Sequence, residues 1–175
     1  MFTILLDVRD VKILQQIKDF FGVGNITTDN GRVRYRVSSK KDLEVIIEHF
    51  KKYPLKTQKL VDYLCFCAGY DLYSQGKHLT NEGFIELLKL KANINKGISK
   101  ELNKAFPNIK PVVRPEIKNQ IVDPNWLAGF TSGEGNFGVW LLNSEKSKLG
   151  VVVQLQFSIS QHLRDLDLIN SFIGF

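Results

Sequence analysis

The sequence predicts an α+β fold in which short antiparallel strands alternate with helices. One observation is a hairpin signal, in which the turn Asp29-Asn30-Gly31 separates strand-like runs at 25–28 and 32–37. The other is an internal repeat: residues 157–175 align with residues 2–20 without a gap, and five of the pairs are identical. We therefore expect one folded half followed by the start of a second, related half.

The start of the chain has the pattern of a strand, a helix, a hairpin and a second helix. Asp10 is the expected N-cap of the first helix, and Gly22-Val23-Gly24 ends it. Ser38 or Ser39 begins the second helix, which ends at Tyr53-Pro54. The expected elements are a strand at 2–8, a helix at 11–21, strands at 25–28 and 32–37, and a helix through about 52.

Three further helices and a proline-rich segment follow. An apolar run predicts a helix at 57–73, Thr80 caps a helix at 81–93, and Ser99 caps a short helix that Pro107 ends. Three prolines between 107 and 115 then indicate a semi-extended linker. The expected organisation is a first half at 1–106, a linker at 107–122 and the start of a second half at 123–175.

The second half begins with a glycine-rich helix at 124–134, with Asp123 as N-cap and Pro124 in the first turn. Gly129 and Gly133 share a face of this helix and would let another helix approach closely. Glu134 lies at the C-terminal end, where a carboxylate opposes the helix dipole and a bound cation would explain it. The spacing of the glycines and Glu134 alone fits a second interpretation equally well, namely a buried glycine-rich helix whose exposed glutamate has no function. Strands at about 136–143 and 149–161 and a helix from about 163 follow.

Composition sets limits on the function. The 175 residues are 43% hydrophobic and 24% charged, which is typical of a globular protein. No run reaches the roughly 18 apolar residues of a membrane span, and the acid at Asp7 argues against a signal peptide, so we expect no membrane partner. Two cysteines, Cys65 and Cys67, cannot build a disulfide framework or a four-ligand zinc site, and their apolar run favours a buried helix.

Positive charge is concentrated in the first part of the chain. The net charge is +6, which makes a polyanionic partner plausible. Residues 1–122 carry a net charge of +8, whereas residues 123–175 carry −2. The basic surface and the glycine-rich helix with its glutamate therefore belong to different parts of the sequence.

The run Trp126-Leu-Ala-Gly-Phe-Thr-Ser-Gly-Glu-Gly135 resembles the signature of the LAGLIDADG homing endonucleases, in the form of fungal mitochondrial intron-encoded members. The resemblance extends over essentially the whole chain. Its supporting runs lie at 53–59, 78–83, 89–92, 105–108, 124–130 and 161–165.

This resemblance implies a fold of two αββαββα halves with antiparallel DNA-binding sheets. The two signature helices of that fold pack side by side, and each ends in an acid that holds Mg²⁺ against a scissile phosphate. On this alignment the chain contains one near-complete half that lacks its signature helix, plus the start of the second half, and so it looks truncated at both ends. It would be encoded in an organelle and would act in the mitochondrial matrix.

The resemblance also implies roles for individual residues. Glu134 aligns with the metal-binding acid, and the carbonyl of Gly133 would join it at the metal. Ser132 stands where many members carry an additional Asp, which departs from the common pattern. Gln161 matches a position that helps to hold the water network, and its counterpart in the repeat is Leu6.

A basic residue near the scissile phosphate is a further family feature. In this sequence Lys59, or its neighbour Lys56, resembles that basic residue. A lysine that is simply solvated at the start of a helix explains Lys59 equally well. The expected catalytic residues are thus Glu134, Gln161 and Lys59.

Two strand faces are candidates for DNA contact. Arg32, Arg34 and Arg36 alternate with apolar residues, so all three guanidinium groups lie on one face of a strand. Arginine suits both phosphates and guanine edges. In the second half, Gln154, Gln156 and Ser158 share a face, where they either contact base edges or are simply solvated.

The expected function is site-specific, metal-dependent hydrolysis of double-stranded DNA. Because the chain has only one signature acid, we expect it not to cut both strands by itself. Two alternatives remain from the sequence: a maturase that binds intron RNA, or a non-catalytic nucleic-acid-binding remnant. In the second case the uncovered face of the helix at 124–135 would cause self-association unless the missing signature helix covers it.

Overall fold

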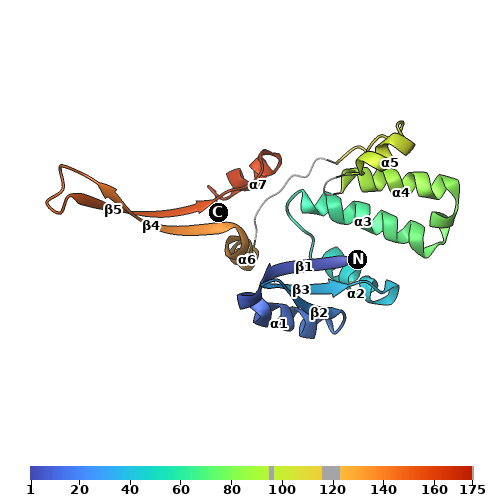
Figure 1. Cartoon of the computed structure of the whole chain (residues 1–175), viewed down its shortest axis with the longest axis horizontal. Helices are drawn as coiled ribbons and strands as arrows, with labels where there is room; N and C mark the ends of the chain where they lie inside the picture. The colour runs from blue at the N-terminus through green and yellow to red at the C-terminus, as the bar shows by residue number, and fades with distance from the viewer. Residues whose placement is uncertain (95–96, 116–122, 175) are drawn as a thin grey trace. The chain divides into compact units, whose positions relative to one another are not determined.

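The computed structural model describes residues 1–94, 97–115 and 123–174. The chain divides into two compact units: Met1–Leu55 with Leu60–Arg114, and Lys56–Lys59 with Pro115–Phe175. Both units combine helices with antiparallel strands (Figure 1), as the sequence predicts. The short segment 56–59 belongs to the second unit, although its neighbours in sequence belong to the first. None of the described helices is both long and apolar enough to cross a membrane.

The first unit contains a sheet of β1 (Phe2–Asp7), β2 (Asn25–Asp29) and β3 (Arg32–Val37) in the order β1-β3-β2. Both pairings are antiparallel. Asn30 and Gly31 join β2 to β3 with φ values of 46° and 74°. Two successive left-handed residues match the right-handed twist of a tight hairpin, which is why Asn-Gly predicts this turn.

Helices α1 (Val11–Phe21) and α2 (Lys40–Lys52) cover one face of this sheet (Figure 1). The hydroxyl of Tyr35 in this core donates a hydrogen bond to the carbonyl of Val23 at 2.9 Å. Because side chains alternate along a strand, the burial of every second residue of β3 places its arginines on the opposite face. The buried core consists of Leu14, Val33, Tyr35, Val37, Leu43 and Ile46.

The caps agree with the sequence in most places. Ser39 begins α2 and accepts the N–H of Asp42, Thr80 accepts the N–H of Gly83, and Ser99 accepts the N–H of Leu102. Asp10 occupies the N-cap position of α1, as predicted, but its side chain makes no capping hydrogen bond there. Asp7 instead accepts the N–H of Arg9 and begins a 3-10 turn, η1 (Val8–Asp10), which leads into α1.

The rest of the first unit is helical. It contains α3 (Lys59–Ser74), the turn η2 (Lys77–Leu79), α4 (Asn81–Asn93) and α5 (Lys100–Ala105). Cys65 is buried in α3 and Cys67 is half-buried, and both are free thiols. Burial raises the pKa of each thiol, which makes both poor nucleophiles.

The start of the predicted linker is held against the first unit. The amide of Asn93 donates to the carbonyl of Val112 at 2.8 Å, and Arg114 donates to the carbonyl of Asn93. The guanidinium of Arg114 also lies 3.5 Å from the carboxylate of Asp62. Residues up to Arg114 therefore pack with α3 and α4, and the remainder of the predicted linker, 116–122, lies outside the described residues.

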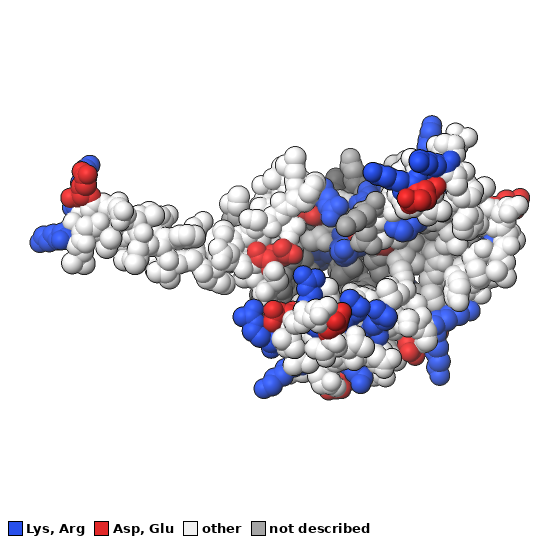
Figure 2. Space-filling view, viewed as in Figure 1, with Lys and Arg blue, Asp and Glu red and all other residues white. Residues whose placement is uncertain are grey.

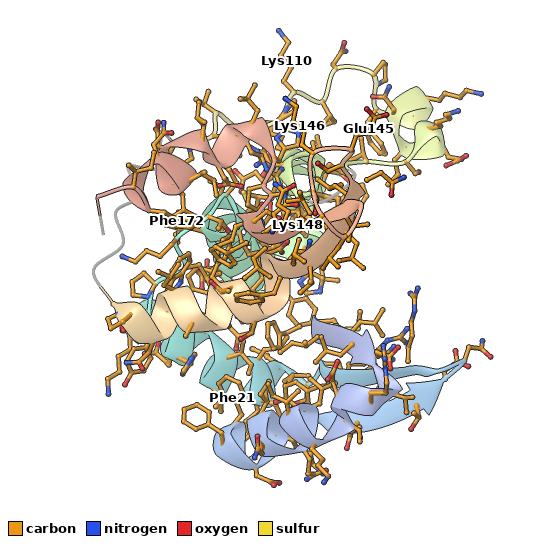
Figure 3. The ribbon with its side chains drawn as sticks, turned by 90° about the vertical axis from the view of Figure 1, so that its left-hand side faces the viewer. Phe21, Lys110, Glu145, Lys146, Lys148 and Phe172 are labelled. Carbon is orange, nitrogen blue, oxygen red and sulfur yellow. The ribbon has the colours of Figure 1, made fainter. Side chains whose placement is uncertain are left out.

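The second unit contains α6 (Pro124–Glu134), β4 (Gly135–Asn143), β5 (Val151–Ile159), the turn η3 (Leu163–Asp165) and α7 (Leu166–Ser171). Strand β4 follows α6 directly and pairs antiparallel with β5, from Gly135↔Ile159 to Asn143↔Val151. The ring of Phe172, labelled in Figure 3, lies edge-on against Phe130 of α6, with 5.8 Å between ring centroids.

Candidate active site and nucleic-acid surface

Glu134 is the last residue of α6, and its side chain is exposed. The N–H of Gly135 donates to the carbonyl of Thr131 and closes the helix immediately after it. The C-terminal end of a helix carries a partial negative charge, so a carboxylate there is unfavourable unless a cation accompanies it. The carbonyl of Gly133 lies in the same last turn, where α6 itself supplies no N–H to it. These two oxygens are the hard ligands that Mg²⁺ prefers.

One face of α6 consists of small residues and is exposed in the described structure. A Cβ added at Gly129 or Gly133 would meet no atom within 4 Å. Ala128 and Ser132 share this exposed face. The hydroxyl of Ser132 donates to the carbonyl of Ala128 at 2.8 Å, so it is satisfied within the helix.

Gln161 lies at the same end of the β4–β5 hairpin as Glu134. Gly135, which follows Glu134, pairs with Ile159, two residues before Gln161. The predicted strand 149–161 is shorter in the structure, so Gln161 follows β5 and is half-buried. Its counterpart in the repeat, Leu6, lies within β1 and packs against the core of the first unit. The two equivalent positions therefore have different surroundings.

Lys59 belongs to the same unit as Glu134 and Gln161, even though it is the first residue of α3. Its backbone N–H donates to Thr57 Oγ1 at 3.1 Å. The N–H of the preceding residue, Gln58, donates to Asp165 Oδ1 at 2.8 Å. Asp165 is 4% exposed and follows Gln161 by four residues. Asp165 was not among the predicted site residues, because nothing near it in sequence indicates a partner at residue 58.

Carboxylates do not gather around Glu134. Among residues 1–94, 97–115 and 123–174, no three His, Cys, Asp or Glu side chains lie close enough together to hold a metal ion. Helix α6 itself supplies the carboxylate of Glu134 and the carbonyl of Gly133 at its C-terminal end. Water and phosphate oxygens would have to complete the coordination of a hard cation there.

The arginine face of the first sheet is the face that α1 and α2 leave open. Arg32 lies between Asp7 and Asp29, Arg34 between Leu5 and Thr27, and Arg36 between Thr3 and Asn25. Arg32 and Arg36 are exposed, whereas Arg34 is half-buried. The cross-strand neighbours add acids and short polar side chains to this face, and only strand pairing reveals them.

The β4–β5 hairpin divides into two faces as the sequence predicts. The polar face pairs Gln154 with Trp140, Gln156 with Gly138 and Ser158 with Asn136. Trp140 was missed, although the alternation of β4 places it on this face. Its indole lies so close to Gly138 that a Cβ at that position would clash. The charged residues of the hairpin lie in the turn at its tip, where Glu145, Lys146 and Lys148 are labelled in Figure 3.

The opposite face of the hairpin is apolar and exposed. The rings of Phe137 and Phe157 pair across the strands, with 4.9 Å between centroids. Figure 2 shows the long hairpin without charge except at its tip, in contrast to the charged first unit. The apolar side chains on this face, each 55–77% exposed, are Phe137, Val139, Leu141, Val153, Leu155 and Phe157.

Comparison with known protein families gives one match that covers most of the chain. The LAGLIDADG endonuclease family matches residues 1–70 and 127–175. Two relatives from Neurospora crassa align over 99% of the chain: probable intron-encoded endonuclease 3 at 37% identity and probable intron-encoded endonuclease 2 at 38%. The chain spans 33% and 40% of their respective lengths. A protein of ND4 intron 1 in Podospora anserina is 44% identical over 73 residues, which is 41% of this chain and 16% of that protein.

Solved structures of LAGLIDADG meganucleases have the same fold. I-CpaMI bound to uncleaved DNA matches with a TM-score of 0.94 at 38% identity, over 98% of this chain and 60% of that one. I-SmaMI bound to cleaved DNA matches with a TM-score of 0.92 at 43% identity, over 98% of this chain and 59% of that one. I-SmaMI has also been solved with an uncleaved DNA target in the presence of calcium ions, with a TM-score of 0.92, 43% identity and coverage of 98% and 60%.

Proposed function

The chain belongs to the LAGLIDADG homing endonuclease family, and we propose that it forms part of an enzyme that cuts a specific double-stranded DNA site with the help of Mg²⁺. The observation that carries this proposal is the position of Glu134. It ends a helix whose small-residue face is open, and it lies at the same end of the hairpin as Gln161. The half-repeats of this enzyme would lie at 1–106 and from 123 onward, joined by the linker 107–122.

DNA binding would use the open faces of the two sheets. Positive charge lies on the open face of the first antiparallel sheet, from Arg32, Arg34 and Arg36, and it suits phosphates and the major groove. Gln154, Gln156 and Ser158 present amides and a hydroxyl that can pair with base edges. The DNA complexes of I-CpaMI and I-SmaMI support double-stranded DNA as the partner.

Hydrolysis would take place at the end of α6. Glu134 and the carbonyl of Gly133 would hold Mg²⁺, which when bound activates water and stabilises the leaving oxygen. Gln161 would orient the water by hydrogen bonding. Lys59 would offset negative charge that develops on the scissile phosphate. The calcium-containing complex of I-SmaMI supports a divalent cation in this family.

The test is DNA cleavage by the purified chain in Mg²⁺, with Glu134→Gln as the matched variant. A single signature acid should not cut both strands, so we expect no linear product from a supercoiled plasmid that carries the target. Cleavage of both strands that is lost in Glu134→Gln would overturn the expected inactivity and support the site. Cleavage that persists in Glu134→Gln would refute the role of Glu134.

The fungal intron-encoded relatives support a mitochondrial matrix location, and one of them lies in an ND4 intron. Glu134 is retained in this chain, which favours a nuclease over a splicing maturase that does not need the metal site.

A further inference from the structure

We propose that Asp165 is a positioning residue whose buried carboxylate holds the segment Lys56–Lys59, and with it Lys59, on the unit that carries Glu134. This inference rests on the proposed roles of Glu134 and Lys59. The inference assigns to Asp165 an effect on the location of Lys59 rather than a direct part in the reaction.

The contact between Asp165 and this segment has the features of a strong tether. The Asp165 side chain is 3% exposed, and its Oδ2 lies 3.8 Å from Arg164 Nε. Its Oδ1 accepts the Gln58 N–H at 2.8 Å, across 107 residues of sequence. A buried carboxylate is costly without hydrogen-bond donors, and a bond from N–H to a charged acceptor is stronger than one to a neutral acceptor. Loss of this bond would leave either the carboxylate or the amide unsatisfied.

Helix capping does not explain this carboxylate. Asp165 occupies the N-cap position of α7, but its side chain makes no capping hydrogen bond there. Asp10, its counterpart in the repeat, occupies the N-cap position of α1 and also makes none. Asp10 is exposed, whereas Asp165 is buried and bonded to Gln58. The two aspartates thus occupy equivalent positions in the repeat and in the local structure. They differ in burial and in the bond that Asp165 accepts from Gln58.

The tether acts on Lys59 through the backbone. Gln58 immediately precedes Lys59, and Thr57 Oγ1 accepts the Lys59 N–H, so hydrogen bonds hold the backbone on the N-terminal side of Lys59. A lysine side chain is long and flexible, and its ammonium stays near one location only if its backbone is held. Asp165 also lies in the turn that follows Gln161, so one short segment carries Gln161 and anchors Lys59.

Amide hydrogen exchange of the full chain tests the tether directly. In Asp165→Ala the Gln58 amide should exchange at least about 10-fold faster, since it loses its acceptor. Asp165→Asn keeps an acceptor oxygen without the charge and should restore part of the protection, which also covers the case in which Asp165→Ala does not fold. Asp10→Ala is the matched control and should leave Gln58 unchanged. Equal exchange of Gln58 in wild type, Asp165→Ala and Asp165→Asn would overturn the tether.

Paramagnetic broadening by Mn²⁺ alone tests the positioning of Lys59. Reductive ¹³C-methylation provides a lysine signal, which Lys59→Arg assigns. In the wild type, Mn²⁺ should broaden both the Gly135 amide and the Lys59 methyl signal. In Asp165→Ala, Mn²⁺ should no longer broaden the Lys59 methyl signal but should still broaden the Gly135 amide signal. In Asp165→Asn, the broadening of the Lys59 methyl signal should partly return. Unchanged Lys59 broadening in Asp165→Ala would overturn the positioning role. If Mn²⁺ does not broaden the Gly135 amide signal in the wild type, or still broadens it in Glu134→Gln, the proposed metal site at Glu134 is wrong. The exchange rate of the Gln58 amide then still tests the bond to Asp165.

Discussion

Asp7 and His162 lie 155 residues apart, and each accepts the backbone N–H of the arginine two positions later. The Arg9 N–H donates to Asp7 Oδ1 at 3.0 Å, and the Arg164 N–H donates to His162 Nδ1 at 3.2 Å. Each acceptor begins a three-residue 3-10 turn, and a helix follows at once, at Val11 and at Leu166. The sequence repeat is therefore also a repeat of local hydrogen bonding, in which the acceptor is a carboxylate oxygen in the first half and an imidazole nitrogen in the second.

The three arginines of β3 should determine how strongly DNA binding depends on salt. Replacing Arg32, Arg34 and Arg36 by alanine removes up to three phosphate contacts, so the slope of log K against log salt should become shallower by roughly 1 per lost contact. Fluorescence anisotropy with a labelled duplex between about 50 and 200 mM salt measures this slope. Lys89→Ala/Lys100→Ala/Lys104→Ala removes the same charge from α4 and α5 and should keep the slope. Equal slopes for both triple variants would refute the arginine face as the DNA surface.

The apolar face of the hairpin should make the chain self-associate. Leu155 is 76% exposed and lies opposite Val139, within a continuous row of exposed apolar side chains. Leu155→Glu should therefore shift sedimentation towards the monomer. Gln154→Glu adds the same charge one residue away, on the polar face, and should leave the distribution unchanged. A wild-type chain that sediments as a monomer at high concentration would contradict this prediction.

Two glycine-to-alanine substitutions in helices should have opposite effects on stability. A Cβ at Gly83 would clash with the carbonyl of Lys77, so Gly83→Ala should destabilise the first unit by about 1–3 kcal/mol. A Cβ at Gly129 would meet nothing, so Gly129→Ala should stabilise α6 by about 0.5–1 kcal/mol. Denaturant unfolding of each variant measures both changes. A neutral Gly83→Ala would mean that η2 can move away from α4.

His49 should make the first unit less stable in mild acid. Its ring contacts Phe20, Phe21, Phe50 and Tyr53, and burial, together with Lys52, lowers its pKa below the ordinary 6.5. Its contribution to stability is fully present above pH 6.5, because both folded and unfolded states are then neutral. As the pH falls below that value the unfolded chain takes up the proton first, so stability is lost until the folded pKa is passed.

Unfolding midpoints at pH 7.5 and pH 5 test this sign. His49→Phe keeps an aromatic ring in the cluster and removes the titration, so its midpoint should change less between the two pH values than that of the wild type. His78→Phe is the control for the loss of an imidazole outside this cluster, because the His78 ring contacts Tyr73 instead. A wild type that gains stability at pH 5 relative to His49→Phe would show that the folded state favours the protonated ring.

Much of the fold and part of the candidate site follow from local sequence. The turn at Asn30-Gly31, the caps at Ser39, Thr80 and Ser99, and the buried alternation of β3 all depend on residues within a few positions of one another. The same alternation places Arg32, Arg34 and Arg36 on the open face before any strand partner is known. Glu134 at the end of α6 follows from the cap at Asp123 and the length of the apolar run.

The cap of the first helix marks the limit of such reasoning. Asp7 and Asp10 are both good N-cap residues and lie three positions apart. Which of them bonds to the backbone depends on where β1 ends, and pairing of Asp7 with Arg32 determines that end. The cross-strand neighbours of the arginines, such as Thr27 and Leu5, depend on the same pairing.

The sequence alone therefore determined the elements, their faces, the repeat and the family. Only the tertiary structure decided that residues 56–59 pack with the second unit, and that Asp165 rather than Asp10 carries a buried bond to a distant amide. The physical reason is the distance along the chain over which each kind of interaction acts. Helix periods, strand alternation and caps act over two to four residues, whereas the Gln58–Asp165 bond joins positions 107 residues apart, and no local pattern encodes it.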